Sequence, residues 1–350
     1  MVVRTALSMF VALAGFRVAT AAEPVAGAGA EAPAAAATPA PAAAPAPPGE
    51  PAVPEDQSLA QGRVLNGHVF MPSATVAGAL TTTSFGTFLL LGIGTTSASA
   101  QVGDKTYSGS FDYAGTGAAL AYEYAFMRYF SARFAMNDII YSGIDGPSAI
   151  VVGTSLQFEA SLGVTASLPV GDSLRVGVLF DAGTTPALGL TIGNGIKTII
   201  DGCRAGSCPT GEGAIFGTQR ATTLKPALAA NWAPWRPLGF TANAAYLSVS
   251  QDEGDQSFTG QAVSLAAAAD FDFLAISQVP VGLQLAFSWT APIGGEILQH
   301  VTDLGGGIFY TGSPHLALGL QFVSRRFAVQ PTVDVNWSSF LSTIGLRYYW

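Results

Sequence analysis

The two cysteines, Cys203 and Cys208, stand close together in the Gly-rich stretch DGCRAGSCPTGEG. In an oxidising compartment such a pair predicts a disulfide. Closing so short a loop stabilises a protein by about 2 kcal/mol at most. A metal ion needs more ligands, and no histidine or further cysteine is near in the sequence, so we expect no metal site here.

A candidate nucleophile is Ser173, in the tetrapeptide GDSL at 171–174. These residues resemble the name motif of a family of secreted lipases and esterases, which implies a soluble α/β domain with a catalytic Asp-x-x-His pair near its end. No Asp-x-x-His occurs in this chain, and Gly-Asp is ordinary turn chemistry. A hydrolase would also need a serine paired with a histidine. No distinctive serine accompanies the histidines, which are His68, His300 and His315. We therefore expect no catalytic residue and no cofactor.

Charged side chains of both signs recur at alternating positions within apolar stretches. Alternate residues of a β-strand share a face, so these charges would point the same way if the stretches are strands. The set comprises Glu123, Arg133, Glu159, Arg175, Asp181, Lys225, Asp270, Asp272 and Arg347. What the charges do depends on the elements that position them.

The composition excludes most soluble and helical architectures. Only 11% of the 350 residues are charged, whereas soluble domains have about a quarter, and the mean hydropathy is +0.39. Beyond the N-terminus, however, there is no run of about 18–20 apolar residues that would predict a membrane helix. Strands in lipid reconcile the two facts, because only half of their side chains must be apolar. The net charge of -8 argues against nucleic acid as a partner.

Strict period-2 alternation runs through long stretches after about residue 85. Leu174, Val176, Val178 and Phe180 form one set of alternate residues, and the 156–168, 283–289 and 316–322 stretches alternate similarly. Several strands should exceed the usual length of about five or six residues. The polar set is rich in Gly, Ala and Ser, which suits a crowded lumen.

The connections alternate between short and long. Short turns are expected near 128 and at 169–172, 234–237, 278–280 and 312–314, and long Gly-rich loops at 142–148, 193–217, 251–257, 292–301 and 325–338. Aromatic residues gather on the short-turn side, as in an interfacial girdle: Tyr122, Tyr124, Phe126, Tyr129, Phe130, Trp232, Trp235, Phe271 and Phe273. This pattern predicts an all-β, antiparallel up-and-down transmembrane barrel with short periplasmic turns and long external loops. We expect about twelve strands within 85–350. Ten or fourteen stay open, since the 327–337 stretch could itself form strand instead of belonging to a loop.

Three segments precede the barrel. Residues 1–22 have Arg4, a short apolar core and a small-residue cleavage site, and predict a signal peptide. Residues 23–58 are dominated by Ala and Pro, which predicts a disordered periplasmic linker. Residues 59–84 form an apolar lead-in, which either enters the lumen as a plug or packs at the rim.

The chain ends in STIGLRYYW, which alternates outward residues and stops on an aromatic side chain; these residues are Ile344, Leu346, Tyr348 and Trp350. The stretch resembles the C-terminal strand of Gram-negative outer-membrane β-barrels. The resemblance implies insertion by the barrel-assembly machinery, contact with outer-membrane lipid and lipopolysaccharide, and pairing of the last strand with the first.

A lumen with charges of both signs predicts a small, weakly selective channel for passive passage of small solutes. The alternative is a non-conducting structural or surface-interaction barrel with a filled lumen, since twelve strands lie near the boundary between the two. A membrane-embedded lipid hydrolase is a distant alternative. We expect a monomer.

Overall fold

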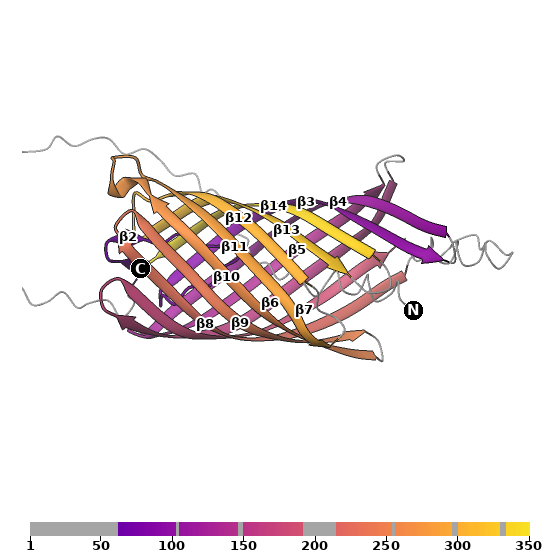
Figure 1. The fold of residues 1–350 in the computed structure, drawn as a ribbon, viewed down its shortest axis with the longest axis horizontal. Helices are drawn as coiled ribbons and strands as arrows, with labels where there is room; N and C mark the ends of the chain where they lie inside the picture. The colour runs from indigo at the N-terminus through magenta and orange to yellow at the C-terminus, as the bar shows by residue number, and fades with distance from the viewer. Residues whose placement is uncertain are drawn as a thin grey trace, which may run out of the picture.

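The computed structural model describes residues 62–102, 105–145, 150–191, 215–253, 256–295, 300–329 and 334–350. Within these ranges the strands β3 to β14 form one closed antiparallel barrel (Figure 1). Each strand pairs with the next along the chain, and β14 pairs with β3. The expected up-and-down barrel of twelve strands is thereby confirmed.

The strands are long, as the alternation predicted. Their bounds are β3 (Ser84–Val102), β4 (Lys105–Met127), β5 (Phe130–Asp145), β6 (Ile150–Val170), β7 (Leu174–Thr191), β8 (Ile215–Trp235), β9 (Leu238–Glu253), β10 (Gln256–Asp272), β11 (Val281–Gly295), β12 (His300–Tyr310), β13 (Leu316–Val329) and β14 (Asp334–Tyr349). A 3-10 turn, η1 (Phe273–Ala275), follows β10. Among the described residues, no helix is long and apolar enough to cross a membrane.

The long loop expected at 325–338 is wrong in its extent. The β13 strand continues to Val329, β14 begins at Asp334, and Arg326 pairs with Ser338 in the ladder between them. Similarly, β11 reaches Gly295 and β9 reaches Glu253. Both faces of a strand are wet where it projects beyond the membrane, so backbone pairing continues there without the apolar alternation on which the sequence interpretation depended.

The outer surface of the barrel is apolar. Large side chains at alternate positions of every strand point outward, and Leu285 is 71% exposed, Leu162 64% and Leu228 64%. Aromatic side chains stack near the short turns, including Phe126 on Phe130 and Tyr348 on Trp350. A surface of this kind is stable facing hydrocarbon, with aromatic rings at the interface.

The last strand closes the sheet. Tyr348 pairs with Phe85 in the β14–β3 ladder, and the Trp350 N–H donates to the Thr83 carbonyl at 3.1 Å. Closure leaves no strand edge in lipid, where an unpaired backbone group would cost several kcal/mol. The prediction that the C-terminal strand pairs with the first is confirmed.

Candidate functional site

Residues 62–83, which we call the plug, lie inside the barrel at its short-turn end. Their apolar side chains are buried, namely Leu65, Phe70, Met71, Val76 and Ala79. Val76 packs against Ala266, Ala268 and Ala286 of the inner wall. Figure 1 shows the label of β2, which belongs to the plug, beside the C-terminus at this end. A segment that precedes the barrel in the chain therefore fills the mouth of its lumen.

The plug begins with a tight hairpin, β1 (Val64–Leu65) paired with β2 (His68–Val69). Between them Asn66 and Gly67 have φ of 48° and 76°, the left-handed conformations that a two-residue type I′ turn requires. The Asn66 amide donates to the Ala233 carbonyl at 2.8 Å. The hairpin is thus bound to the end of β8.

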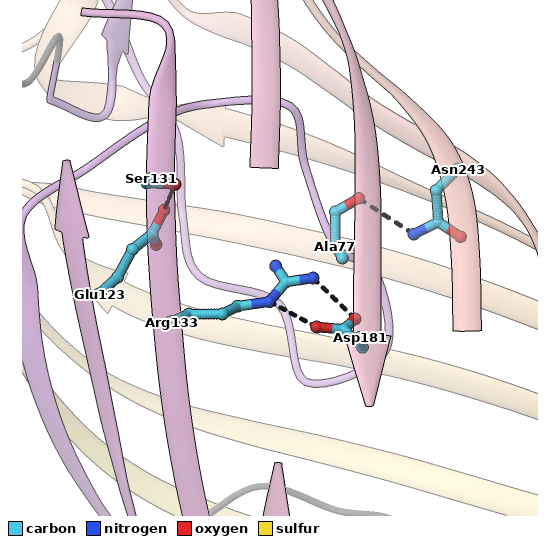
Figure 2. Close-up of polar contacts among 6 residues, drawn as sticks. All are labelled: Ala77, Glu123, Ser131, Arg133, Asp181 and Asn243. Atoms are coloured by element: carbon cyan, nitrogen blue, oxygen red, sulfur yellow. Dashed lines mark hydrogen bonds and ion pairs between the residues drawn. The ribbon is translucent and has the colours of Figure 1, made fainter. Parts of the chain in front are cut away.

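The rest of the plug has no regular secondary structure, and inward amide side chains of the barrel satisfy several of its backbone groups. The Ala79 N–H donates to Asn231 Oδ1 at 2.6 Å, and Asn243 Nδ2 donates to the Ala77 carbonyl at 3.0 Å (Figure 2). Gln321 Oε1 accepts from the Ala74 N–H at 2.9 Å, and Gln284 Nε2 donates to the Met71 carbonyl at 3.1 Å. Polar wall residues therefore replace the partners that a sheet would supply.

Two of the charged residues expected in the lumen also bind the plug. One Asp270 carboxylate oxygen accepts from the Met71 N–H at 3.1 Å, and the other accepts from Gln284 Nε2 at 2.8 Å. Glu123 accepts from the Thr82 hydroxyl at 2.9 Å and from the Ser131 hydroxyl at 2.7 Å, the second shown in Figure 2. These carboxylates hold the plug rather than a free solute.

His68 is the most deeply buried titratable group of the plug, with 0% exposure. Its Nδ1 lies 2.9 Å from the Arg236 carbonyl and therefore carries the proton, while no partner is found for the buried Nε2 among the described residues. Burial lowers the pKa of His68, partly offset by the Arg236 carbonyl and by Asp272, and Arg63 lowers it further. The docked plug thus favours a neutral imidazole.

Next to the plug, the lumen contains a cavity of about 380 Å³, lined by plug residues and by the inner wall of the barrel. Six of the nine charged residues expected in the lumen line it: Glu123, Arg133, Glu159, Asp181, Lys225 and Arg347. Arg133 binds Asp181 through two bonds of 2.7 Å, from Nε and Nη2 (Figure 2). Arg325 binds Asp303 in the same way, also at 2.7 Å. Much of the lumen charge is therefore paired, between adjacent strands for Arg325 and Asp303 and across the intervening β6 for Arg133 and Asp181.

The remaining candidates lie outside this cavity. Asp270 and Asp272 are buried at the short-turn end, where Asp272 accepts from the Thr311 hydroxyl at 2.7 Å. Arg175 is also buried there, and its Nε and Nη1 have no partner among the described residues. Ser173 occupies the turn before β7, and its carbonyl accepts from the Ala233 N–H.

The other motifs are dispersed. His315 Nδ1 contacts the Tyr349 carbonyl at 3.1 Å near the short turns, whereas His300 opens β12 at the opposite end. Cys203 and Cys208 lie outside the described residues, so their disulfide stays a prediction. In the part of the chain that the structure describes, no group of three or more His, Cys, Asp or Glu residues could hold a metal ion.

Sequence reasoning missed the wall residues that bind the plug and one lumen ion pair. The amides are Asn231, Asn243, Gln284 and Gln321, and the ion pair is Arg325 with Asp303. All occupy inward positions of strands, so the alternation could have placed them. Arg325 was not included among the expected lumen residues because it fell within the loop expected at 325–338.

No protein-family model and no curated protein matches the chain. Among solved structures, the translocator domain of the autotransporter NalP from Neisseria meningitidis is 10% identical, with a TM-score of 0.45 over 77% of this chain and 89% of that one. The beta domain of the Bordetella autotransporter BrkA is 11% identical, with a TM-score of 0.42 over 74% and 98%. A deltaS2S3 mutant of the monoaromatic hydrocarbon channel TodX is 12% identical, with a TM-score of 0.41 over 84% and 98%.

The barrel itself gives the class of the protein. Its sheet is closed, its exterior is apolar with stacked aromatic rings near the short turns, and its interior holds the polar and charged side chains together with smaller apolar clusters. Only a closed barrel can satisfy all strand hydrogen bonds while facing lipid. This chain is a transmembrane β-barrel.

Proposed function

We propose that the protein is an outer-membrane channel for small solutes that rests closed, with residues 62–83 as its plug. The observation that carries the proposal is the way the plug is bound. Polar side chains from β4, β8, β9, β10, β11 and β13 reach its backbone or hydroxyl groups, at Glu123, Asn231, Asn243, Asp270, Gln284 and Gln321. Such reversible polar contacts suit a segment that docks and leaves.

The charge of the lumen supports weak selectivity. Arg133 with Asp181 and Arg325 with Asp303 are bidentate pairs, so their fields largely cancel for a passing solute. A channel that strongly selects one sign would instead carry rings of unpaired like charge. Reversal potentials in a salt gradient should accordingly stay well below the limit for a perfectly selective pore.

A non-conducting barrel is the second candidate, and one observation favours it. Leu90 and Ile139 point inward and are 1% and 2% exposed, packed with Val323 and Leu341. Part of the lumen beyond the plug is therefore filled by side chains. Lipid hydrolysis has no comparable support, because Ser173 sits at the short-turn end and His300 at the other.

Removal of the plug is the test that separates channel from filled barrel. We compare single-channel conductance of the full chain and of a chain lacking residues 23–83, each refolded and inserted in planar bilayers. The full chain should be closed for most of the time, and the shortened chain should give frequent discrete steps. Silence of both proteins, with barrel formation verified by circular dichroism, would overturn the channel proposal and support a filled barrel.

Acid should open the channel through His68. The docked imidazole has a lowered pKa, so the undocked plug, with a pKa near 6.5, binds the proton better. Docking is therefore fully stable above about pH 7 and weakens as the pH falls through 6.5 towards the lower docked value. From pH 7.5 to 5.5 the open fraction should rise by up to about tenfold.

The matched control for this prediction is His68→Asn, whose amide can still donate to the Arg236 carbonyl but does not titrate in this range. Asp272 and Arg63 are the charged groups near the ring, and both are present in parent and variant. Open probability is measured at both pH values. An equal acid response in His68→Asn would refute the assignment to this histidine.

A further inference from the structure

The cavity next to the plug has the size and lining of a binding chamber rather than of a simple water-filled gap. Its volume of about 380 Å³ falls within the range of small-molecule sites, about 300–1,000 Å³. The plug forms its floor, with Val76 and Leu80 among the lining residues, and Phe88 and Leu247 add apolar wall. Apolar surface beside a few polar groups is typical of pockets that bind small organic molecules.

The charges around this chamber do not balance. Five cationic side chains line it, Arg63, Arg133, Lys225, Arg325 and Arg347, against four carboxylates, Glu123, Glu159, Asp181 and Asp303. Two arginines are committed to aspartates in bidentate pairs, and Arg63 donates to the carbonyls of Pro314 and Ser313. The lining therefore has an excess of one positive charge.

Arg347 is one of the cations that contribute to this excess. Among the described residues it makes no ion pair, and its buried Nε has no hydrogen-bond partner. Its guanidinium lies over the Phe88 ring, 5.5 Å from the ring centre. Gly86 leaves room for this pair, because a Cβ there would lie 3.0 Å from both Arg347 Nε and the Phe88 ring, and a Cβ at Gly345 would also contact that ring. Two glycines thus make space for a cation on an aromatic surface inside the cavity.

We propose that the chamber binds a small organic monoanion, a carboxylate with an apolar body, with the carboxylate on Arg347 and the body against Phe88 and the plug. A guanidinium is suited to a carboxylate, which it can bind through two parallel hydrogen bonds. The excess of one positive charge in the lining matches one negative charge, and the apolar lining matches the rest of the molecule. This inference rests on the proposed function, since it names the class of solute that the closed channel would hold.

The test measures binding to the full chain in detergent micelles, without any need for conduction. Benzoate serves as the probe, benzamide as its neutral analogue and phthalate as its dianion, each titrated by ligand-observed NMR or calorimetry. Benzoate should bind at least about tenfold more tightly than benzamide, because a hydrogen bond to a charged group is worth more than a neutral one. Phthalate should bind more weakly than benzoate, since its two negative charges exceed the single excess positive charge of the lining.

Three variants identify the residue. Arg347→Gln should weaken benzoate binding about tenfold or more and leave benzamide unchanged, whereas Arg347→Lys should recover part of the affinity. The matched control is Arg326→Gln, which removes an exposed arginine of the same strand as Arg325 and should bind like the parent. Each variant must first show the heat-modifiable mobility of a folded barrel.

Equal affinity for benzoate and benzamide, or unchanged benzoate binding in Arg347→Gln, would overturn the anion site. The outcome is independent of the conductance experiment. If the shortened chain stays silent in bilayers while benzoate still binds the full chain through Arg347, the channel proposal fails and the site remains. If the shortened chain conducts but benzoate binding does not depend on Arg347, the channel proposal stands and the anion site fails.

Discussion

A full-length chain carrying Asn231→Ala and Asp270→Ala should open far more often than the parent. The substitutions remove the wall acceptors for the Ala79 and Met71 N–H groups, at 2.6 and 3.1 Å. Together the two hydrogen bonds stabilise the docked plug by about 2–3 kcal/mol, at about 1–1.5 kcal/mol each. The ratio of open to closed time should rise by about 30- to 150-fold, since each 1.36 kcal/mol is a factor of ten. Single-channel recording measures this ratio directly.

A control must lose lumen hydrogen bonds of similar kind without touching the plug. Asn137→Ala with Thr290→Ala meets this need, because these side chains bond to Glu159 and Ser264 of the wall at 2.9 and 3.0 Å. We expect its open probability to stay within about threefold of the parent. If the Asn231→Ala, Asp270→Ala chain stays closed as often as this control, the plug contacts do not determine the open probability.

The barrel was predictable because its signal is repeated in every strand. Leu174, Val176 and Val178 alternate with inward residues, and a one-residue slip in register would turn each apolar side chain into the lumen. The C-terminal strand adds an aromatic end at Trp350. Errors arose only at strand ends such as Val329, where solvent on both faces removes the pattern while the ladder continues.

The plug was harder to predict because it forms no regular secondary structure after its short hairpin. Its conformation is fixed by the barrel wall and not by its own sequence, so neither a helical nor a strand period appears. One local signal was present, however. Asn66-Gly67 between short apolar pairs is the dipeptide of a type I′ hairpin, and the structure has both residues at positive φ.

The pairing of lumen charges could not be read from the sequence at all. Arg133 is on β5 and its partner Asp181 is on β7, with Gly163 of β6 between them. A Cβ at Gly163 would contact both side chains, so the ion pair exists because the intervening strand has no side chain there. Such a contact requires particular residues of three strands to stand side by side. The alternation shows which face each residue lies on, but not which residues of neighbouring strands lie opposite one another.

A reversible cross-link between plug and wall tests the central claim most directly. An ideal Cβ on Gly177 would lie 3.1 Å from the Ala79 Cβ, close to the separation of about 3.5–4.5 Å found in disulfides. Ala79→Cys with Gly177→Cys is introduced into the loosened Asn231→Ala, Asp270→Ala chain, with Cys203→Ser and Cys208→Ser to exclude other bonds. The single variant with Gly177→Cys alone in the same background is the control.

The measurement is single-channel conductance of this cross-linked barrel, recorded in one bilayer before and after addition of a reductant. Because the disulfide holds the plug in the mouth of the lumen, we expect silence before reduction and the frequent openings of the loosened chain afterwards. The control should conduct equally under both conditions. Equal conductance of the cross-linked barrel before and after reduction would contradict the account, since solutes would then pass by a route that the plug does not close.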